Sequence, residues 1–223
     1  MAKSRVNILY NANMAHITFR CHNREFLFED DSVKDFIITL WKKYKKVYGI
    51  KLFECIVLDN HAHALVMFPN QPALSDFMRT VNSQISRFVN KLLDRDSQVI
   101  RERFRSPVVR KWKYFRNVIS YIWKNAQDVM GQGSDPKKYA YSSLHMRLFQ
   151  PKSAAQLLDD YGAAGYSIGP SFQSFAESIC NALPKTNFSP QVFENVHTVD
   201  DDAKIRENER YFCNLWKMRA RPP

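Results

Sequence analysis

Two histidines stand one residue apart in an otherwise apolar run, LDNHAHALVMF at residues 58–68. Because side chains alternate between the two faces of a strand, His61 and His63 are expected to point the same way as Leu65 and Met67. Two imidazoles on one face can converge on a single divalent cation. The spacing by itself is also compatible with two polar residues at the mouth of a hairpin.

A tyrosine and an asparagine four residues apart supply the second half of a candidate site. The segment YFRNVISYIWKNAQDVMG at 114–131 has helical spacing, so Tyr121 and Asn125 are expected to share a helix face, about 6 Å apart along its axis. An amide oxygen is a ligand suited to Mg²⁺ or Mn²⁺, and it could complete a site begun by two histidines. Taken alone, an aromatic residue in an amphipathic helix is more often part of the core.

The net charge of +11 is distributed unevenly along the chain. The stretch RERFRSPVVRKWKYFR at 101–116 interleaves basic and aromatic residues, which can bind phosphates and stack on bases respectively. This pattern favours single-stranded nucleic acid as a partner, although a solvated basic face would explain the charge alone. The candidate nucleic-acid-binding residues are Arg101, Arg103, Arg105, Arg110, Lys111 and Lys113. Lys42, Lys43, Lys45 and Lys46 form a second, less specific basic cluster.

The elements that must position these residues alternate between strands and helices. The periodicity predicts, in order, a strand at 15–19, a helix at 30–49, a hairpin at 51–68 turning at Asp59-Asn60, a helix at 73–95, a strand within 103–111 and a helix at 113–130. This order is typical of an α+β, ferredoxin-like antiparallel sheet with two helices on one face. The other face would be free to carry a site, to which the helix at 113–130 is added.

Two parts of the chain differ in composition. Residues 1–150 read as one catalytic domain. After about residue 150 the composition changes: GAAGYSIGPSFQS at 162–174 is rich in glycine and serine, prolines recur at 184 and 190, and a helix is expected only at 200–220. We interpret 151–223 as a C-terminal helical extension.

The four cysteines favour buried free thiols over zinc or disulfides, because they form no CxxC pair. They are Cys21, Cys55, Cys180 and Cys213. Lacking a signal-peptide core and any apolar run of about 18–20 residues, the chain is expected to be cytoplasmic, and nucleoid-associated if bacterial.

Four ordered blocks over residues 14–145 resemble the REP-associated tyrosine transposases, a branch of the single-tyrosine HUH transposases and endonucleases. MAHITFRCHNREFLFEDD is similar to that family's opening strand and loop, and LDNHAHALV to its MPNHxHxLx signature. NSQISRFVNKLLDR with RERFRSPVV is similar to the segments that follow, and SYIWKNAQDVMGQ with KKYAYSS to the YIxxNPxxAG and yxxSS block. Leu58-Asp59 and Ala126 depart from the usual Met-Pro and Pro, but they remove no reacting group.

The resemblance implies a mechanism and a role for each site residue. Tyr121 resembles the nucleophile, His61 and His63 the paired metal ligands, and Asn125 the third ligand, for Mg²⁺ or Mn²⁺. The implied enzyme nicks single-stranded DNA near a hairpin, forms a 5′-phosphotyrosine intermediate, leaves a free 3′-OH and rejoins strands by the reverse reaction.

The remaining histidines receive no part in this mechanism. We expect His16 and His22 to be structural or to face DNA, while His145 and His197 belong to no motif.

Two other functions and two assembly states remain open at this point. The chain could be a catalytically silent hairpin DNA-binding protein or regulator on the same fold. An RNA-binding ferredoxin-like module is a further alternative, but its aromatic-rich strand pattern is missing. The protein is expected to be a monomer or a homodimer, since related transposases can supply the tyrosine helix from a partner chain.

Overall fold

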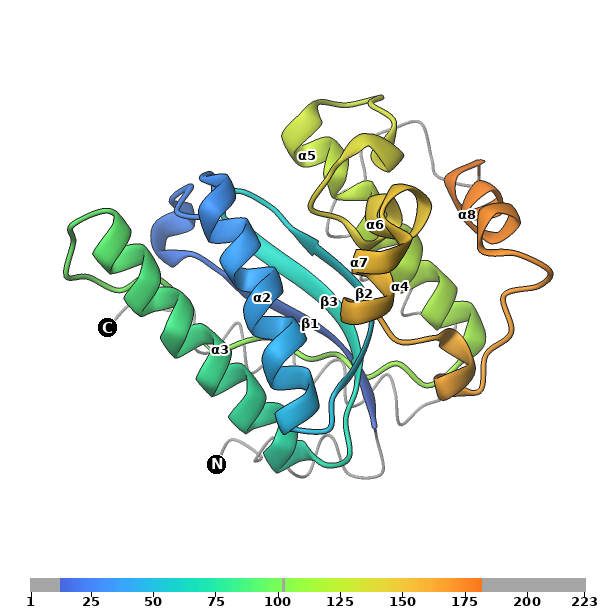
Figure 1. Ribbon diagram of the computed structural model, residues 1–223, viewed down its shortest axis with the longest axis horizontal. Helices are drawn as coiled ribbons and strands as arrows, with labels where there is room; N and C mark the ends of the chain where they lie inside the picture. The colour runs from blue at the N-terminus through green and yellow to red at the C-terminus, as the bar shows by residue number, and fades with distance from the viewer. Residues whose placement is uncertain (1–12, 102, 182–223) are drawn as a thin grey trace.

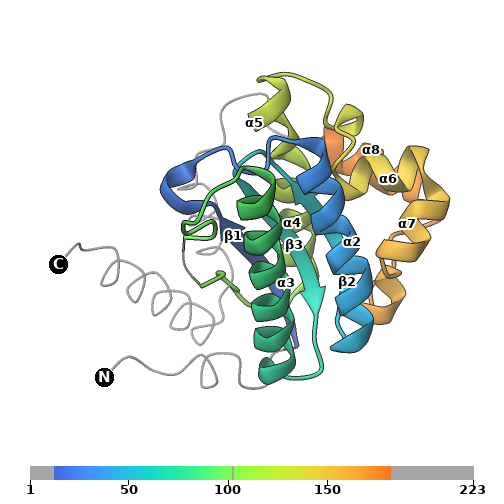
Figure 2. The same ribbon diagram turned by 60° about the vertical axis from the view of Figure 1, so that its left-hand side comes forward.

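An antiparallel sheet of three strands forms the centre of the fold, which the computed structural model describes over residues 13–101 and 103–181. The strands β1 (Met14–Arg20), β2 (Lys51–Val57) and β3 (His61–Met67) are arranged in the order β1-β3-β2. Helices α2 (Asp31–Val47) and α3 (Gln71–Leu92) lie side by side on one face, and α4 (Trp112–Lys124) lies against the other (Figures 1 and 2). The predicted α+β class is confirmed.

Local sequence explains where the two long helices begin. The side chain of Asp30 accepts a hydrogen bond from the Ser32 backbone N–H at 2.7 Å and caps α2. Asn70 caps α3 in the same way, accepting from the Ala73 N–H at 2.9 Å. Such caps satisfy backbone donors that a helix start leaves without an internal partner.

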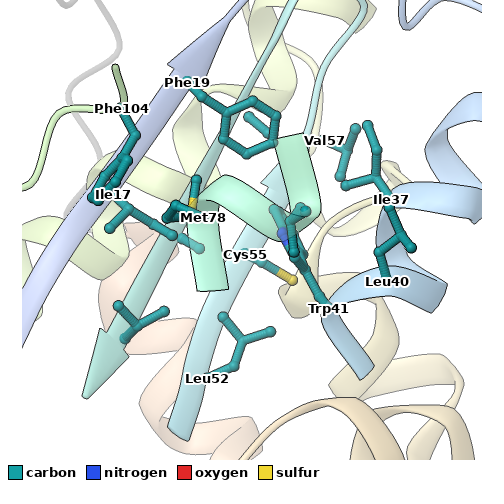
Figure 3. Packing of buried hydrophobic residues seen from close by; sticks show 14 of the residues in the cluster. Ile17, Phe19, Ile37, Leu40, Trp41, Leu52, Cys55, Val57, Met78 and Phe104 are labelled. Atoms are coloured by element: carbon teal, nitrogen blue, oxygen red, sulfur yellow. The ribbon is translucent and has the colours of Figure 1, made fainter. Parts of the chain in front are cut away.

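Two apolar clusters lie on opposite faces of the sheet. The residues of the first cluster labelled in Figure 3 are Ile17, Phe19, Ile37, Leu40, Trp41, Leu52, Cys55, Val57, Met78 and Phe104. Ala62 and Ala64 belong to this first cluster, whereas Leu65 belongs to the second, which lies between the sheet and α4. The expected alternation of β3 is therefore confirmed, and it directs His61 and His63 toward α4.

The segment at 99–109 occupies the fourth position of the sheet, beside β1. We predicted a strand within 103–111, but this segment makes only isolated bridges. They are Cys21–Ile100, Thr18–Arg105 and Ala15–Val108. Pro107 has no N–H, so it accepts a hydrogen bond from His16 N at 2.9 Å but cannot return one. The order of the ferredoxin-like sheet is kept, with an irregular edge in place of a regular strand.

The predicted helix at 113–130 is divided in two at Asn125. Helix α4 ends at Lys124 and α5 (Ala126–Met130) follows. The Asn125 carboxamide donates from Nδ2 to the Tyr121 carbonyl at 2.6 Å, sharing an acceptor that also receives the Asn125 backbone N–H at 3.2 Å. A side chain that competes for backbone acceptors in this way favours the end of a helix.

The sheet face that we expected to be free is covered by α4 and by part of the C-terminal region. The remaining elements are η1 (His22–Arg24), η2 (Pro136–Lys138), α6 (Ser143–Phe149), α7 (Pro151–Leu157), η3 (Tyr161–Ala164) and α8 (Phe172–Asn181). Tyr161 and Phe175 from this region pack with Phe115 of α4.

Some expectations fall outside the described residues, namely the helix at 200–220, Cys213 and His197. Cys21 and Cys55 are buried free thiols, as expected, and Cys180 is a half-buried free thiol. None of the helices over 13–101 and 103–181 has the length and apolar character needed to cross a membrane.

Candidate active site

The two histidines of β3 lie together in a buried position beneath α4. Their ring centroids are 5.0 Å apart, and His61 and His63 are only 7% and 3% exposed. In the strand register, His61 lies opposite Arg20 and His63 opposite Thr18 of β1. The hairpin turn at Asp59-Asn60 therefore places both imidazoles at one end of the sheet, next to the end of β1.

Hydrogen bonds assign a tautomer to His61. Its Nδ1 lies 2.6 Å from the side-chain Oδ1 of Asn60, an acceptor, so Nδ1 carries the proton and donates. The Nε2 atom then keeps its lone pair. A neighbouring oxygen that fixes the tautomer and the ring orientation is the usual second partner of a metal-binding histidine.

His63 is oriented by two side chains of β1. Its Nδ1 lies 3.0 Å from His16 Nε2 and 2.9 Å from Thr18 Oγ1, and in the Nδ1–H tautomer it donates a hydrogen bond to one of them. The His63 Nε2 atom is buried and has no hydrogen-bond partner among the described residues. A buried nitrogen of this kind is costly to leave unsatisfied, so it marks a place for a ligand.

Tyr121 and Asn125 meet these histidines within the same chain. The Tyr121 ring lies edge-on to the His63 ring, with centroids 5.3 Å apart and an interplanar angle of 89°. The Asn125 carboxamide is 7% exposed and lies close enough to the side chains of both His61 and Tyr121 to shift their pKa values. The structure thus brings together Tyr121, His61, His63 and Asn125.

Both imidazoles are neutral at physiological pH. Burial lowers the pKa of His61 to about 3, with a further contribution from Arg20 that an Asn125 hydrogen bond partly offsets. Burial also holds the pKa of His63 well below its usual value, helped by the positive charge of neighbouring groups. Two neutral imidazoles beside a carboxamide suit a divalent cation, which would bind through imidazole lone pairs and the amide oxygen.

The tyrosine is protonated at neutral pH in the protein alone. Burial raises the pKa of Tyr121 and Asp128 raises it further, while Asn125, Arg20 and Arg105 act in the opposite direction. Within 13–101 and 103–181, no group of three or more His, Cys, Asp or Glu side chains is arranged to hold a metal ion. A cation at this site would therefore depend on the two histidines and an uncharged oxygen.

The depressed histidine pKa values predict that acid destabilises the protein. Unfolded histidine titrates near pH 6.5, so below that pH the unfolded state binds more protons than the native state. Stability is full above about pH 6.5 and falls on acidification, by at most about 1.4 kcal/mol per pH unit for each histidine. Urea unfolding at pH 7 and pH 5 should show this loss, and it should be smaller in His61→Gln/His63→Gln. An equal loss in both proteins would contradict the assignment.

A buried carboxylate connects β2 to the helix that carries Tyr121. The register of β2 shifts between Leu52 and Glu54, so Phe53 and Glu54 both face α4 instead of alternating. Glu54 is fully buried and accepts a hydrogen bond from Trp123 Nε1 of α4 at 2.6 Å. Its other donors are Ser143 Oγ, Tyr161 OH and Arg147 Nε. Residues of α6 and η3 therefore share one carboxylate with α4.

The predicted DNA-binding residues are all exposed, but they do not gather at one place. Arg101 and Arg105 lie near the site, since Arg101 N donates to Arg20 O at 3.0 Å and Arg105 bridges Thr18. Arg103 lies between them in the chain. Arg110, Lys111 and Lys113 follow Val109, whose N–H donates to Met14 O at the opposite end of β1. The six residues thus span the length of the sheet edge.

Three residues of β1, His16, Thr18 and Arg20, lie at the site although the sequence patterns did not assign them to it. His16 stacks on His63 with centroids 5.1 Å apart and lies edge-on to Tyr121 at 5.7 Å. Thr18 and Arg20 continue the same face of the strand. The signal was present in HITFR, where polar residues alternate with apolar ones, but it needed the pairing of β1 with β3 to be interpreted.

Comparisons with known proteins agree with this geometry. The family described as "Transposase IS200 like" matches residues 10–129, which is more than half of the chain. A solved structure of a REP-associated tyrosine transposase bound to a REP hairpin has a similar fold, with a TM-score of 0.53 and 17% sequence identity, over 63% of this chain and 81% of that chain. Comparison with curated proteins found no match. The resemblance drawn from the sequence blocks is confirmed: the chain belongs to the IS200-like transposase family.

Proposed function

We propose that this transposase-family protein is a metal-dependent endonuclease and strand transferase for single-stranded DNA, with Tyr121 as the nucleophile. The observation that carries the proposal is the contact between Tyr121 and His63, 5.3 Å between ring centroids within one chain, with Asn125 beside both Tyr121 and His61. A nucleophile, two neutral imidazoles and an amide oxygen can together support metal-assisted phosphodiester transfer by a tyrosine.

Each of the four site residues has its own role in the proposed reaction. His61 and His63 would hold Mg²⁺ or Mn²⁺ through Nε2, and Asn125 would supply its amide oxygen. The bound cation would polarise the scissile phosphate and stabilise the charge that develops on it. Tyr121 loses its phenolic proton and attacks phosphorus, which forms the 5′-phosphotyrosine bond and breaks the bond to the 3′ oxygen. That oxygen takes up a proton and leaves as a free 3′-OH.

The same site can rejoin DNA. Attack by a 3′-OH on the phosphotyrosine breaks the bond to Tyr121 and restores a phosphodiester, so no external energy source is needed. The structure with a similar fold that holds a REP hairpin supports a substrate in which the cleaved single strand lies next to a hairpin. The net charge of +11 also supports a polyanionic partner.

A labelled hairpin oligonucleotide with a single-stranded flank tests the proposal. With Mn²⁺ we expect an adduct that survives denaturation and maps by mass spectrometry to the Tyr121 peptide; with EDTA we expect none. His63→Ala should lower the Mn²⁺ affinity at least about tenfold, as measured by calorimetry without DNA. Tight hairpin binding without an adduct in any divalent metal would instead indicate a catalytically silent DNA-binding protein.

Phosphate contacts along the sheet edge predict a steep salt dependence. If the six basic residues from Arg101 to Lys113 each contact a phosphate of a single strand, log K should fall with log salt at a slope of about −4. Fluorescence anisotropy with a labelled oligonucleotide over a series of salt concentrations measures this slope. A slope near zero would rule out this surface as the DNA-binding track.

A further inference from the structure

The loop from Arg20 to Phe26 adjoins the candidate site and is held in a strained conformation. Asn23 and Arg24 both have positive φ, 49° and 61°, in the left-handed region that residues other than glycine rarely adopt. Cys21 N donates to Asn60 O at 2.8 Å, and Asn60 Nδ2 donates to the Arg24 carbonyl at 3.1 Å. Asn60 also orients His61, so the loop and the histidine share one anchor.

Contacts from the segment after α3 hold the other side of the loop. Glu25 forms an ion pair with Arg95 at 2.9 Å, and His22 N donates to Val99 O at 2.8 Å. Strained residues persist only where the surrounding structure imposes the conformation, and they are enriched at ligand-binding positions. The loop is therefore preorganised.

This fixed loop presents an aromatic side chain to solvent. Phe26 is 65% exposed, more than any other large apolar side chain in the described part of the chain, whereas Leu27 and Phe28 are buried. A single exposed apolar residue needs no explanation by itself. Phe26 is distinguished by its place: it lies two residues after Arg24, on a loop hydrogen-bonded to Asn60, the neighbour of His61.

Positive charge gathers around the same loop. Arg20 lies opposite His61 in the strand register, and its backbone carbonyl accepts from Arg101 N. The pKa of Arg20 is lowered by burial and then by the nearby charges of Arg24, Arg105 and Arg101, while Tyr121 acts in the opposite direction. Clustered arginines beside a tyrosine repel one another, and a phosphate between them relieves that repulsion.

We propose that Phe26, Arg24, Arg20 and Arg101 bind the nucleotide next to the scissile phosphate, with its base stacked on Phe26 and its phosphates held by the arginines. Exposed aromatic rings beside a basic track are how proteins bind single-stranded nucleic acid with little base preference. The identity of the ligand rests on the proposed function, because the surface lies beside Tyr121.

Base stacking is tested by binding in EDTA, where cleavage does not compete. In the wild type, we expect one abasic position in the single-stranded flank to weaken binding roughly tenfold, and 2-aminopurine there to be quenched. Phe26→Ala should bind the intact strand roughly tenfold more weakly, lose the quenching and show no further loss with the abasic strand. Phe26→Trp should restore binding. Phe149→Ala is the matched control. Phe149 is 60% exposed and lies on α6, a helix that packs against β2 rather than against β1.

The charge contribution is tested by Arg24→Asn, because asparagine tolerates positive φ. We expect the salt slope of binding to become shallower by about 0.7, the value for one phosphate of a single strand. Arg79→Asn, which removes an equal charge from exposed α3, should leave the slope unchanged.

The outcomes separate this inference from the proposed function. Wild-type affinity and quenching in Phe26→Ala, with Tyr121 adducts still forming, would overturn the loop's role and leave the enzyme intact. Loss of quenching in Phe26→Ala without any adduct in the wild type would support the loop and overturn the enzyme. A change in molecular mass of Phe26→Ala, measured by light scattering, would show that Phe26 contacts a second copy, and would overturn the nucleotide assignment.

Discussion

Replacing Tyr121 with phenylalanine is expected to abolish the covalent protein–DNA adduct and to reduce strand cleavage by roughly 10⁴-fold or more, since the attacking oxygen is removed. The ring contacts with His16 and His63 remain, because phenylalanine keeps the aromatic ring. Hairpin affinity should therefore stay within about twofold of the wild type. Denaturing gels with an end-labelled oligonucleotide measure the adduct, and anisotropy measures the affinity.

Tyr166→Phe provides the matched control. Tyr166 packs against Trp112 and Phe115 of α4, and the substitution keeps these ring contacts. Wild-type cleavage is expected. An adduct that persists in Tyr121→Phe would show that another residue is the nucleophile, and the proposed chemistry would fail.

Glu54→Ala is expected to cause the largest loss of stability, about 3–5 kcal/mol in the free energy of unfolding. The substitution leaves Arg147, 15% exposed, without its ion-pair partner at 3.3 Å, and it removes the acceptor for Trp123. Burial, and next the Glu54 carboxylate, holds the pKa of Tyr161 well above its usual value, so the Tyr161 hydroxyl remains a donor that also needs this acceptor. Urea denaturation should show a midpoint lower by roughly 2 M.

Asp76→Ala is the appropriate comparison, because Asp76 forms an exposed ion pair with Arg79 at 2.9 Å on α3. Pairs of this kind contribute about 0–1 kcal/mol, so the urea midpoint should move little. If Glu54→Ala were no more destabilising than Asp76→Ala, the carboxylate would not be the link between β2, α4 and the C-terminal region.

Much of the fold can be predicted because its signals are local. The apolar spacing and the capping residues Asp30 and Asn70 identify α2 and α3, and the turn at Asp59-Asn60 identifies the hairpin. Strand alternation alone predicts that His61 and His63 share a face. The four positions of the candidate site are brought together as the motif spacing predicts, while their chemical roles stay predictions.

The features that escaped prediction depend on pairing between distant segments. His16 reads as an ordinary strand residue until the register of β1 against β3 places it 3.0 Å from His63. The shift in β2 that turns Glu54 toward α4 leaves no mark in the alternation of KLFECIV. Asn125 divides its helix through one side-chain hydrogen bond, which spacing rules do not anticipate.

The position of Tyr121 on a helix that packs against its own chain's β3 has a consequence for assembly. Because Tyr121, Asn125, His61 and His63 come from one polypeptide, their encounter is a step in folding rather than an association between molecules. The four groups meet without a contribution from a second copy of the chain.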